Sequence, residues 1–498
     1  MLVIDEDCLR LIFEELCDDR CTMYSCLLVN RLWCEAVVPV LWKDPWKFLN
    51  DLKDFKRDEQ FLNTILLHLS KESRNNLTSR DDINKYINIP QQQQTPLFNY
   101  INFIKYIRKK YQCLNVKNVC HQFFYDCTFK YILEQEVYKL LISKCASLKF
   151  LDITDMKYPL HEYSGATTNL SCIKELQCKS CDSEELFYGL SKICNSIEKL
   201  CVSYTSSNPG LAELIETQNN LKYVKILVNT NAKKIMKWED KCQMIDQAII
   251  KHSNKLIYLD IPIESISLSF YINLFPQLIN LQTFILDGNM LCDTKLENQL
   301  LFSSSYSKLQ VIHLDCVSFF TAKRLIQNTV QNLQIIWTNN ICFDTEDQSK
   351  NFIRIIYQNC PYLKYVKFLL KGQYFEEIEQ LLKICKFLEG LYIDVDHRIN
   401  NYLNGDELLD ILIRFAPNSL YKLQLNYCEF ETKSFNSFFI EWKKRKSLWL
   451  YLNNINIKSD NDFKIEFIDL IKKYKDEKVI KICELNEKFN FINDYIEL

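Results

Sequence analysis

The chain has 498 residues, of which 48% are hydrophobic and 25% charged, and its formal net charge is −2. This composition is typical of a soluble globular protein and argues against a general nucleic-acid binder, which needs a basic excess to neutralise phosphates. Glycine is scarce, with 7 residues where average usage would supply about 35. The sequence contains no G-x-G-x-x-G or G-x-x-x-x-G-K-[ST] motif, which excludes Gly-rich phosphate loops of these kinds.

The N-terminus and the cysteine content indicate a compartment. Three acids among the first seven residues are incompatible with a signal peptide, and no run of about 18 apolar residues exists to span a membrane. The 22 cysteines are therefore expected to be reduced thiols that behave as small hydrophobic side chains. We expect a cytoplasmic or nuclear protein, or one present in both compartments, that binds neither membrane nor nucleic acid.

Residues 1–48 are expected to form a small helical module with two apolar helix faces. The members of these faces are Leu9, Ile12, Phe13 and Leu16, followed by Leu28, Leu32 and Trp33. A module of this size has a marginal core of its own. A partner or a neighbouring domain should therefore cover part of it.

Three signatures in this module resemble the F-box. An acidic start precedes L-x-x-I-F-x-x-L at 9–16, Val-Asn-Arg-Leu-Trp occupies 29–33, and Leu-Trp closes the module at 41–42. Ile4-Asp5 stands where the family has Leu-Pro. The resemblance implies docking on a Skp-type adaptor. The adaptor-binding residues that it implies are Ile4, Leu9, Ile12, Phe13, Leu16, Leu28, Val29, Arg31, Trp33, Leu41 and Trp42.

Residues 49–96 are expected to hold a connecting helix and a polar linker. The linker, from 71 to 96, contains four consecutive glutamines at 91–94 between Pro90 and Pro96. Such a composition buries little surface and is typical of a mobile loop.

From residue 97 onward the chain is periodic. The phrase apolar-x-x-apolar-x-apolar recurs with a mean spacing of about 27 residues, and a period of 20–29 residues with L-x-x-L-x-L is typical of leucine-rich repeats. The twelve copies begin at residues 148, 173, 197, 221, 256, 281, 309, 333, 363, 388, 420 and 448.

The repeats predict an α/β solenoid with parallel strands on its concave face and helices outside. Within each phrase, alternate side chains should point into the core and out to the concave face. Amphipathic segments at 346–359, 375–386 and 406–415 predict outer helices, the first with a capping box at 345–348. Asn, Asp, Ser and Cys are expected to replace glycine in the turns after the strands, as at Asn229, Asn289, Cys428 and Asn456. About twelve repeats run from 145 to 458, and the domain 97–498 is closed by caps at 97–144 and 459–498, which carry helical periodicity without a clean strand phrase.

An F-box followed by leucine-rich repeats is a recurrent architecture of substrate receptors in SCF-type cullin–RING ubiquitin ligases. The resemblance implies a non-catalytic receptor without a cofactor, whose partners are a Skp-type adaptor, a cullin scaffold and a protein target. The alternative is a repeat scaffold without a ubiquitin-ligase role, whose N-terminal helices only cap the solenoid.

The outward positions of the strands form the candidate target surface, because exposed aromatic residues are frequent interaction hot spots. Two explanations stay open for these side chains: they bind a target, or they are covered by the C-terminal tail or by their neighbours. The candidates are Tyr223, Tyr258, Asp260, His313, Trp337, Tyr365 and Tyr392.

Other polar and thiol groups favour structural roles. Cys178 and Cys181 form a C-x-x-C pair, but both fall on repeat positions, which favours the core over redox or zinc chemistry. The cluster at 113–127 (Cys113, Cys120, His121, Cys127) has no zinc-module spacing, so no metal site is predicted. The basic run at 443–446 is expected to be a solvated helix face, with an acidic-partner patch or a nuclear-import signal as alternatives.

Overall fold

The computed structural model describes residues 5–48, 55–78, 96–108, 127–228, 243–262, 270, 273–288, 305–396, 402–457 and 463–485. The chain divides into two compact units, residues 1–252 and 253–498, which are described separately.

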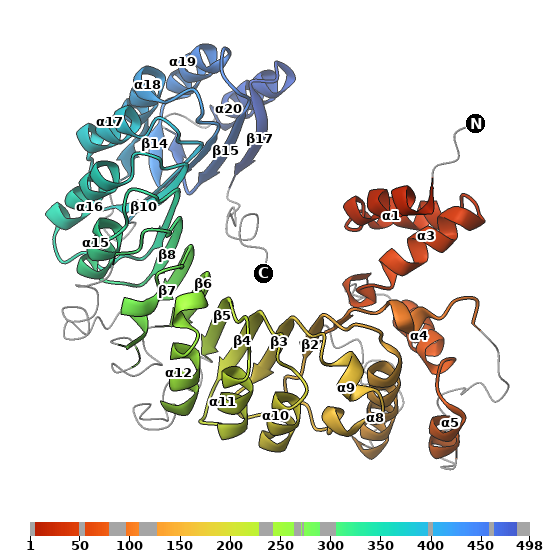
Figure 1. Cartoon of the computed structure of the whole chain (residues 1–498). Coiled ribbons are helices and arrows are strands. Elements are labelled where there is room, and N and C mark those ends of the chain that lie inside the picture. Colours follow the sequence, from red (N-terminus) through yellow and green to blue (C-terminus); the bar gives the residue numbers. More distant parts are fainter. Residues whose placement is uncertain are drawn as a thin grey trace. The chain divides into compact units, whose positions relative to one another are not determined.

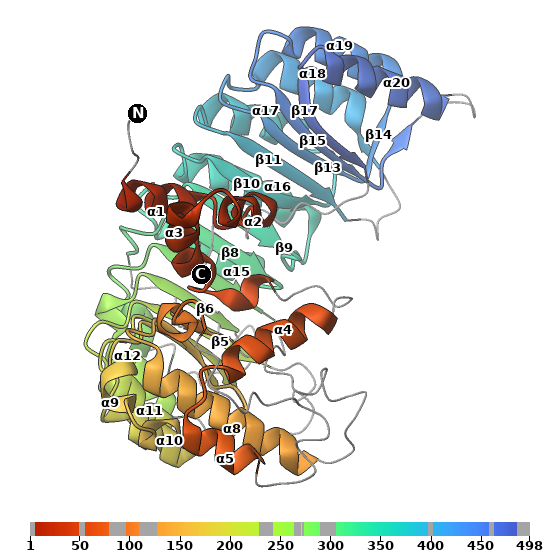
Figure 2. The ribbon, with the colours of Figure 1, turned by 90° about the vertical axis from the view of Figure 1, so that its right-hand side faces the viewer.

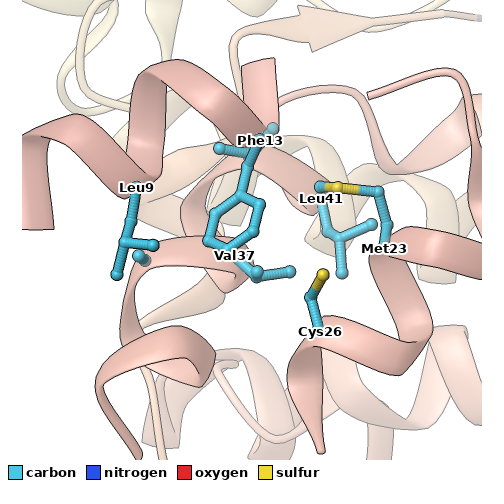
Figure 3. Close-up of a cluster of buried hydrophobic side chains, with 8 residues drawn as sticks. Leu9, Phe13, Met23, Cys26, Val37 and Leu41 are labelled. Carbon is cyan, nitrogen blue, oxygen red and sulfur yellow. The ribbon is translucent and has the colours of Figure 1, made fainter. Parts of the chain in front are cut away.

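The first unit begins with three helices that form the N-terminal module, residues 5–48. They are α1 (Glu6–Glu15), α2 (Arg20–Leu27) and α3 (Arg31–Leu41). The side chain of Asp19 caps α2 by accepting the Thr22 N–H at 3.1 Å, and Asn30 caps α3 by accepting the Trp33 N–H at 2.9 Å. Figure 3 shows the apolar core between the three helices, where Phe13 and Leu9 of α1 face Val37 of α3.

Two further helices follow, α4 (Phe55–Leu66) and α5 (Lys71–Thr78). The prediction of a polar linker from residue 71 is therefore wrong for 71–78. The Ser70 hydroxyl caps α5 by accepting the Ser73 N–H at 3.0 Å. Leu77 is fully buried, so this otherwise polar helix packs on the protein through an apolar side chain. Residues 79–95, with the glutamine run, lie outside the described residues.

The remainder of the first unit is a strip of parallel strands with helices along one side (Figure 1). In β3 and β4, buried and partly exposed residues alternate, as the repeat phrase predicts. The strands, in order, are β1 (Tyr106–Ile107), β2 (Phe150–Asp152), β3 (Glu175–Lys179), β4 (Lys199–Tyr204) and β5 (Tyr223–Val228). The helices are α8 (Cys127–Lys144), α9 (Ala166–Asn169), α10 (Glu184–Ser191), α11 (Pro209–Glu216) and α12 (Gln243–Ile250).

The second unit repeats this plan, and Figure 2 shows its last strands side by side beneath α18 and α19. Its parallel strands are β6 (Tyr258–Pro262), β7 (Thr283–Asp287), β8 (Val311–Asp315), β9 (Ile335–Asn339), β10 (Tyr365–Leu370), β11 (Gly390–Val395), β13 (Lys422–Asn426), β15 (Leu448–Asn453) and β17 (Ile480–Leu485). The helices are α15 (Phe319–Gln327), α16 (Glu346–Asn359), α17 (Phe375–Ile384), α18 (Gly405–Phe415), α19 (Thr432–Trp442) and α20 (Phe463–Asp476). A small second sheet joins β12 (Leu403–Asn404), β14 (Cys428–Phe430) and β16 (Asn456–Ile457).

The predicted solenoid fold is confirmed, because each of the twelve phrases carries a parallel strand. The last phrase is one residue out of register: Leu450 pairs with Leu423, so Leu450 and Leu452 are the inward residues. The caps also contain strands, β1 and β17, which the helical periodicity did not predict.

The capping box of α16 is present with a shifted partner. The Thr345 hydroxyl accepts the Gln348 N–H at 3.3 Å, as predicted. The Gln348 side chain accepts the N–H of Asp344 at 2.8 Å, one residue before the expected N-cap.

Left-handed backbone occurs within three residues of the end of several strands, at residues that are not glycine. The φ angles are +53° at Asp155, +51° at Cys316, +48° at Asn340, +54° at Tyr427 and +50° at Asn454. Residues other than glycine thus adopt the left-handed conformation in these turns, as predicted. They are not the residues that the sequence analysis named. Of those, Cys428 and Asn456 begin strands, and Asn229 and Asn289 lie outside the described residues.

Buried cysteines connect consecutive repeats. The thiols of Cys145, Cys194 and Cys385 donate to the carbonyl oxygens of Ile101, Leu170 and Cys360, at 3.5, 3.2 and 3.5 Å. Burial raises the pKa of each of these three thiols to about 12. They are therefore apolar spacers rather than reactive groups.

We predict that iodoacetamide will spare these three thiols in the folded protein. At about pH 8, a thiol with a pKa of about 12 is thiolate in only about one molecule in ten thousand. The exposed Cys8, Cys21 and Cys181 should be labelled first, as measured by mass spectrometry of tryptic peptides. In concentrated guanidinium chloride all thiols should react. Labelling of Cys385 as fast as that of Cys181 would contradict its burial.

Candidate functional site

The N-terminal module exposes large apolar side chains although its own core is complete. Tyr24 of α2 and Leu28, the residue that directly follows this helix, are four residues apart and lie on the same side of it. Leu28 is 87% exposed and Ile12 of α1 is 47% exposed. Exposed apolar side chains of this size, when grouped, mark interaction surfaces. The exposed apolar set consists of Leu11, Ile12, Tyr24, Leu28 and Val29.

The structure divides the predicted adaptor-binding residues into two groups. Ile12, Leu28, Val29 and Arg31 are exposed, and Arg31 pairs with Glu35 at 2.8 Å. The second group belongs to the core: Leu9, Phe13 and Leu41 are buried, while Leu16, Trp33 and Trp42 pack partly buried against them. Ile4 lies outside the described residues.

The assignment of Leu9, Phe13 and Leu41 as surface contacts is therefore wrong. Leu9 and Phe13 are one helical turn apart on the stripe that faces α3, so the module itself buries them. Leu11 and Tyr24 were missed. Their signal in the sequence was an apolar residue lying off the buried stripe of its helix.

A second face of the module is joined to the first repeats through tryptophans. The ring of Trp42 lies 4.6 Å from that of Tyr100 and 5.4 Å from that of Phe61, centroid to centroid. The indole of Trp46 is fully buried, packs on Phe61 and donates to the carbonyl of Tyr106 in β1. We call this contact, between residues 42–46 on one side and Phe61 with residues 100–108 on the other, the seam.

An ion pair completes the seam. Arg108 lies 2.8 Å from the carboxylate of Asp44, and the Lys105 N–H donates to the Lys43 carbonyl at 2.9 Å. Burial raises the pKa of Asp44, and the positive charge of Arg108 opposes that shift. The Arg108 guanidinium also lies over the ring of Phe150, at 4.7 Å from its centroid. The seam therefore extends from the module to β2.

The predicted target surface is largely packed rather than open. Asp260 is 9% exposed, and only Tyr223 and His313 are partly accessible to solvent. The remaining candidates, which are buried, are Tyr258, Trp337, Tyr365 and Tyr392.

Side chains in neighbouring parallel strands meet in columns, and this explains the packing. The rings of Trp337 and Tyr392 are 4.9 Å apart, and Tyr365 belongs to the same apolar cluster. Gly390 leaves the space for the Tyr365 ring, because a Cβ at 390 would lie 2.5 Å from its Cδ1 atom. Of the two explanations left open, packing against neighbours therefore holds for Trp337, Tyr365 and Tyr392.

Polar groups around this cluster are also engaged. The Lys367 ammonium group lies 5.3 Å from the Trp337 ring centroid and donates to the side chain of Asn339. The Asn339 amide contacts the His313 imidazole at 3.2 Å. The Tyr365 hydroxyl donates to Glu389 at 2.6 Å. This network fixes the positions of the side chains around the cluster.

The cysteine motifs add no metal site within the described ranges, where no three His, Cys, Asp or Glu side chains converge. Cys178 is buried in β3, where burial raises the pKa of its thiol, while Cys181 is exposed in the following turn. Cys113, Cys120 and His121 lie outside the described residues. As for membranes, none of the described helices has the length and apolar character needed to cross one.

Comparison with known proteins gives structural similarities at low sequence identity. No family model and no curated protein matches the chain. The structure of the Rad7 and Elc1 complex in yeast has a TM-score of 0.40 at 14% identity, covering 70% of this chain and 78% of that one. The leucine-rich repeat-containing protein LegL7 from Legionella pneumophila has a TM-score of 0.32 at 14% identity, covering 61% and 91%.

We predict that Gly390→Ala will destabilise the second unit by about 1–3 kcal/mol, because the new methyl group overpacks the Tyr365 ring. Urea unfolding followed by tyrosine and tryptophan fluorescence measures the change. In a Tyr365→Ala background the same substitution should cost much less, which a double-mutant cycle isolates. Equal costs in both backgrounds would show that the glycine is not there to make room for the ring.

Proposed function

We propose that the chain is a non-catalytic substrate-recognition subunit of an SCF-type ubiquitin ligase. In this proposal the N-terminal module binds a Skp-type adaptor, which links it to the cullin scaffold, and the repeats bind the protein to be ubiquitinated. The proposal follows the F-box resemblance of residues 9–42. The observation that carries it is the exposed apolar set of the module.

Burial of that set would release a substantial free energy. A fully buried leucine contributes roughly 1.5–3 kcal/mol relative to an exposed one. Leu28 alone leaves most of its side chain in water, although the core of the module is already filled without it. An adaptor that covers Leu28, Ile12 and Tyr24 would account for this exposure.

The module has two separate surfaces, the exposed apolar set and the seam, so it can bind an adaptor and the repeat domain at the same time. The exposed set lies on α1, on α2 and in the turn after α2, whereas the seam begins at Trp42 and continues through η1 (Pro45–Phe48). Different residues thus serve the two contacts. A partner bound to the exposed set would not need to displace the seam.

The test is the loss of adaptor binding through surface substitutions. We predict that Leu28→Asp combined with Ile12→Asp will abolish co-purification with a Skp-type adaptor, because two buried charges without partners would replace two apolar contacts. Circular dichroism should show an intact fold, since both side chains are exposed. The matched control is Val330→Asp, an exposed apolar position of the second unit, which should leave adaptor binding unchanged.

Two results would contradict the proposal: a wild-type chain that captures no adaptor, or a double variant that captures as much adaptor as the wild type. Substitution of Phe13 is unsuitable for this test, because the residue is 1% exposed and its loss would unfold the module.

The seam favours the second candidate, a repeat scaffold whose N-terminal helices act as a cap. Deletion of residues 1–48 cannot separate the two functions. The seam residue Trp46 lies within the deleted segment, and its loss would uncover Phe61 and leave the Tyr106 carbonyl without its donor in either case. The surface variants do separate them, since a cap needs the seam but does not need an exposed Leu28.

A further inference from the structure

Lysine and aromatic side chains gather where the last strands of the second unit begin. Tyr421 directly precedes β13, Lys446 precedes β15 by two residues, Trp449 lies in β15, and Lys481 lies in β17. Strands β13, β15 and β17 are consecutive neighbours in the sheet, so their first residues share one edge. We call these four residues the lysine–aromatic edge.

Cation–π contacts hold the lysines in place. The Lys446 ammonium group is 4.0 Å from the ring centroid of Tyr421, and that of Lys481 is 5.1 Å from the ring centroid of Trp449. A third ammonium group, from Lys422, lies 4.6 Å from the Trp449 centroid and 5.7 Å from that of Tyr421. The two rings contact each other edge to face at 6.4 Å. The lysine side chains are therefore held in defined positions by the aromatic rings.

The four basic residues at 443–446 make different contacts in the structure. Lys443 pairs with Glu477 at 2.8 Å, and Arg445 donates to the Ala416 carbonyl at 2.9 Å. These two groups secure the turn between α19 and β15. Lys446 points to Tyr421, and Lys444 remains exposed. The run is thus not a uniformly solvated helix face, and Lys446 is its contribution to the edge.

The charge of the edge is not neutralised locally. Across the described residues, no carboxylate lies within 4.0 Å of the Lys446 or the Lys481 ammonium group, although many other surface lysines have such a partner. Residues 443–453 contain four basic side chains and no acid. The Glu389 carboxylate, which directly precedes β11, accepts a hydrogen bond from the Tyr365 hydroxyl. The edge is therefore a positively charged surface with half-buried aromatic rings beneath it.

We propose that the lysine–aromatic edge binds an acidic segment of a partner protein, with its carboxylates on Lys446 and Lys481. Carboxylates form charge-assisted hydrogen bonds with ammonium groups, and the rings hold the two lysines in position for such contacts. This inference rests on the proposed function only in calling that partner the target for ubiquitination; the binding itself does not require the adaptor.

A protein segment fits the edge better than single-stranded nucleic acid does. Nucleic acids bind such surfaces by stacking bases on free aromatic faces. Here each ring already has two ammonium groups over it, so the rings are engaged by lysines. The net charge of −2 also provides no general attraction for a phosphate backbone.

The test uses the full chain and a fluorescein-labelled hexaglutamate peptide, with binding followed by fluorescence anisotropy. We predict measurable binding that weakens as ionic strength rises, and no binding of hexaglutamine. Lys446→Gln combined with Lys481→Gln should weaken hexaglutamate binding at least about tenfold, because two charge-assisted contacts are removed. The matched control is Lys444→Gln with Lys478→Gln, which removes the same charge from neighbouring exposed positions and should change affinity less than about twofold.

Three outcomes would overturn the proposal. One is equal weakening in the two double variants, which would indicate a diffuse field; another is the absence of any hexaglutamate binding. The third is tighter binding of an oligothymidylate that depends on Lys446 and Lys481, which would assign the edge to nucleic acid. The Leu28→Asp/Ile12→Asp variant should keep its affinity for hexaglutamate, so that failure of adaptor binding and failure of this inference are distinguished.

Discussion

Each repeat in this chain depends on burial by its neighbours. A single strand and helix cannot cover both of their apolar faces, whereas a stack covers all of them except at its ends. The inward leucines of β11, β13 and β15 show this directly, since Leu391, Leu423 and Leu450 are paired in register and are fully buried. Thiol contacts such as that of Cys194 with the Leu170 carbonyl cross the same boundaries. Stability therefore belongs to the junctions between repeats.

The same constraint explains the N-terminal module. The end of a stack exposes an apolar surface, and in this chain the seam through Trp42 and Trp46 covers it. The module uses one group of apolar residues for its own core, a second for the seam and a third, which includes Leu28, that neither contact covers. A cap would need only the first two groups, whereas a docking module also needs the third.

The period of the sequence was sufficient to place the strands, because inward apolar residues are required wherever a strand faces a core. The same reasoning was insufficient for the outward face. Sequence pattern indicates that Trp337, Tyr365 and Tyr392 point away from the core, but not that parallel columns bring their rings together or that Gly390 makes room for one of them. In the module, helical spacing grouped Ile12 with Leu9 and Phe13, although only the latter two face α3. The lysine–aromatic edge could not be predicted, since Lys446 and Trp449 become meaningful only once β13, β15 and β17 are adjacent.

The seam has a mechanical consequence. Arg108 contacts Asp44 on the module side and the Phe150 ring on the repeat side, and the backbone of residue 105 bonds to both Lys43 and Phe150. Side-chain and backbone contacts therefore tie the module to the first two strands. Any movement of the module away from β1 and β2 would have to break the Arg108–Asp44 ion pair and the backbone bond between Lys105 and Lys43.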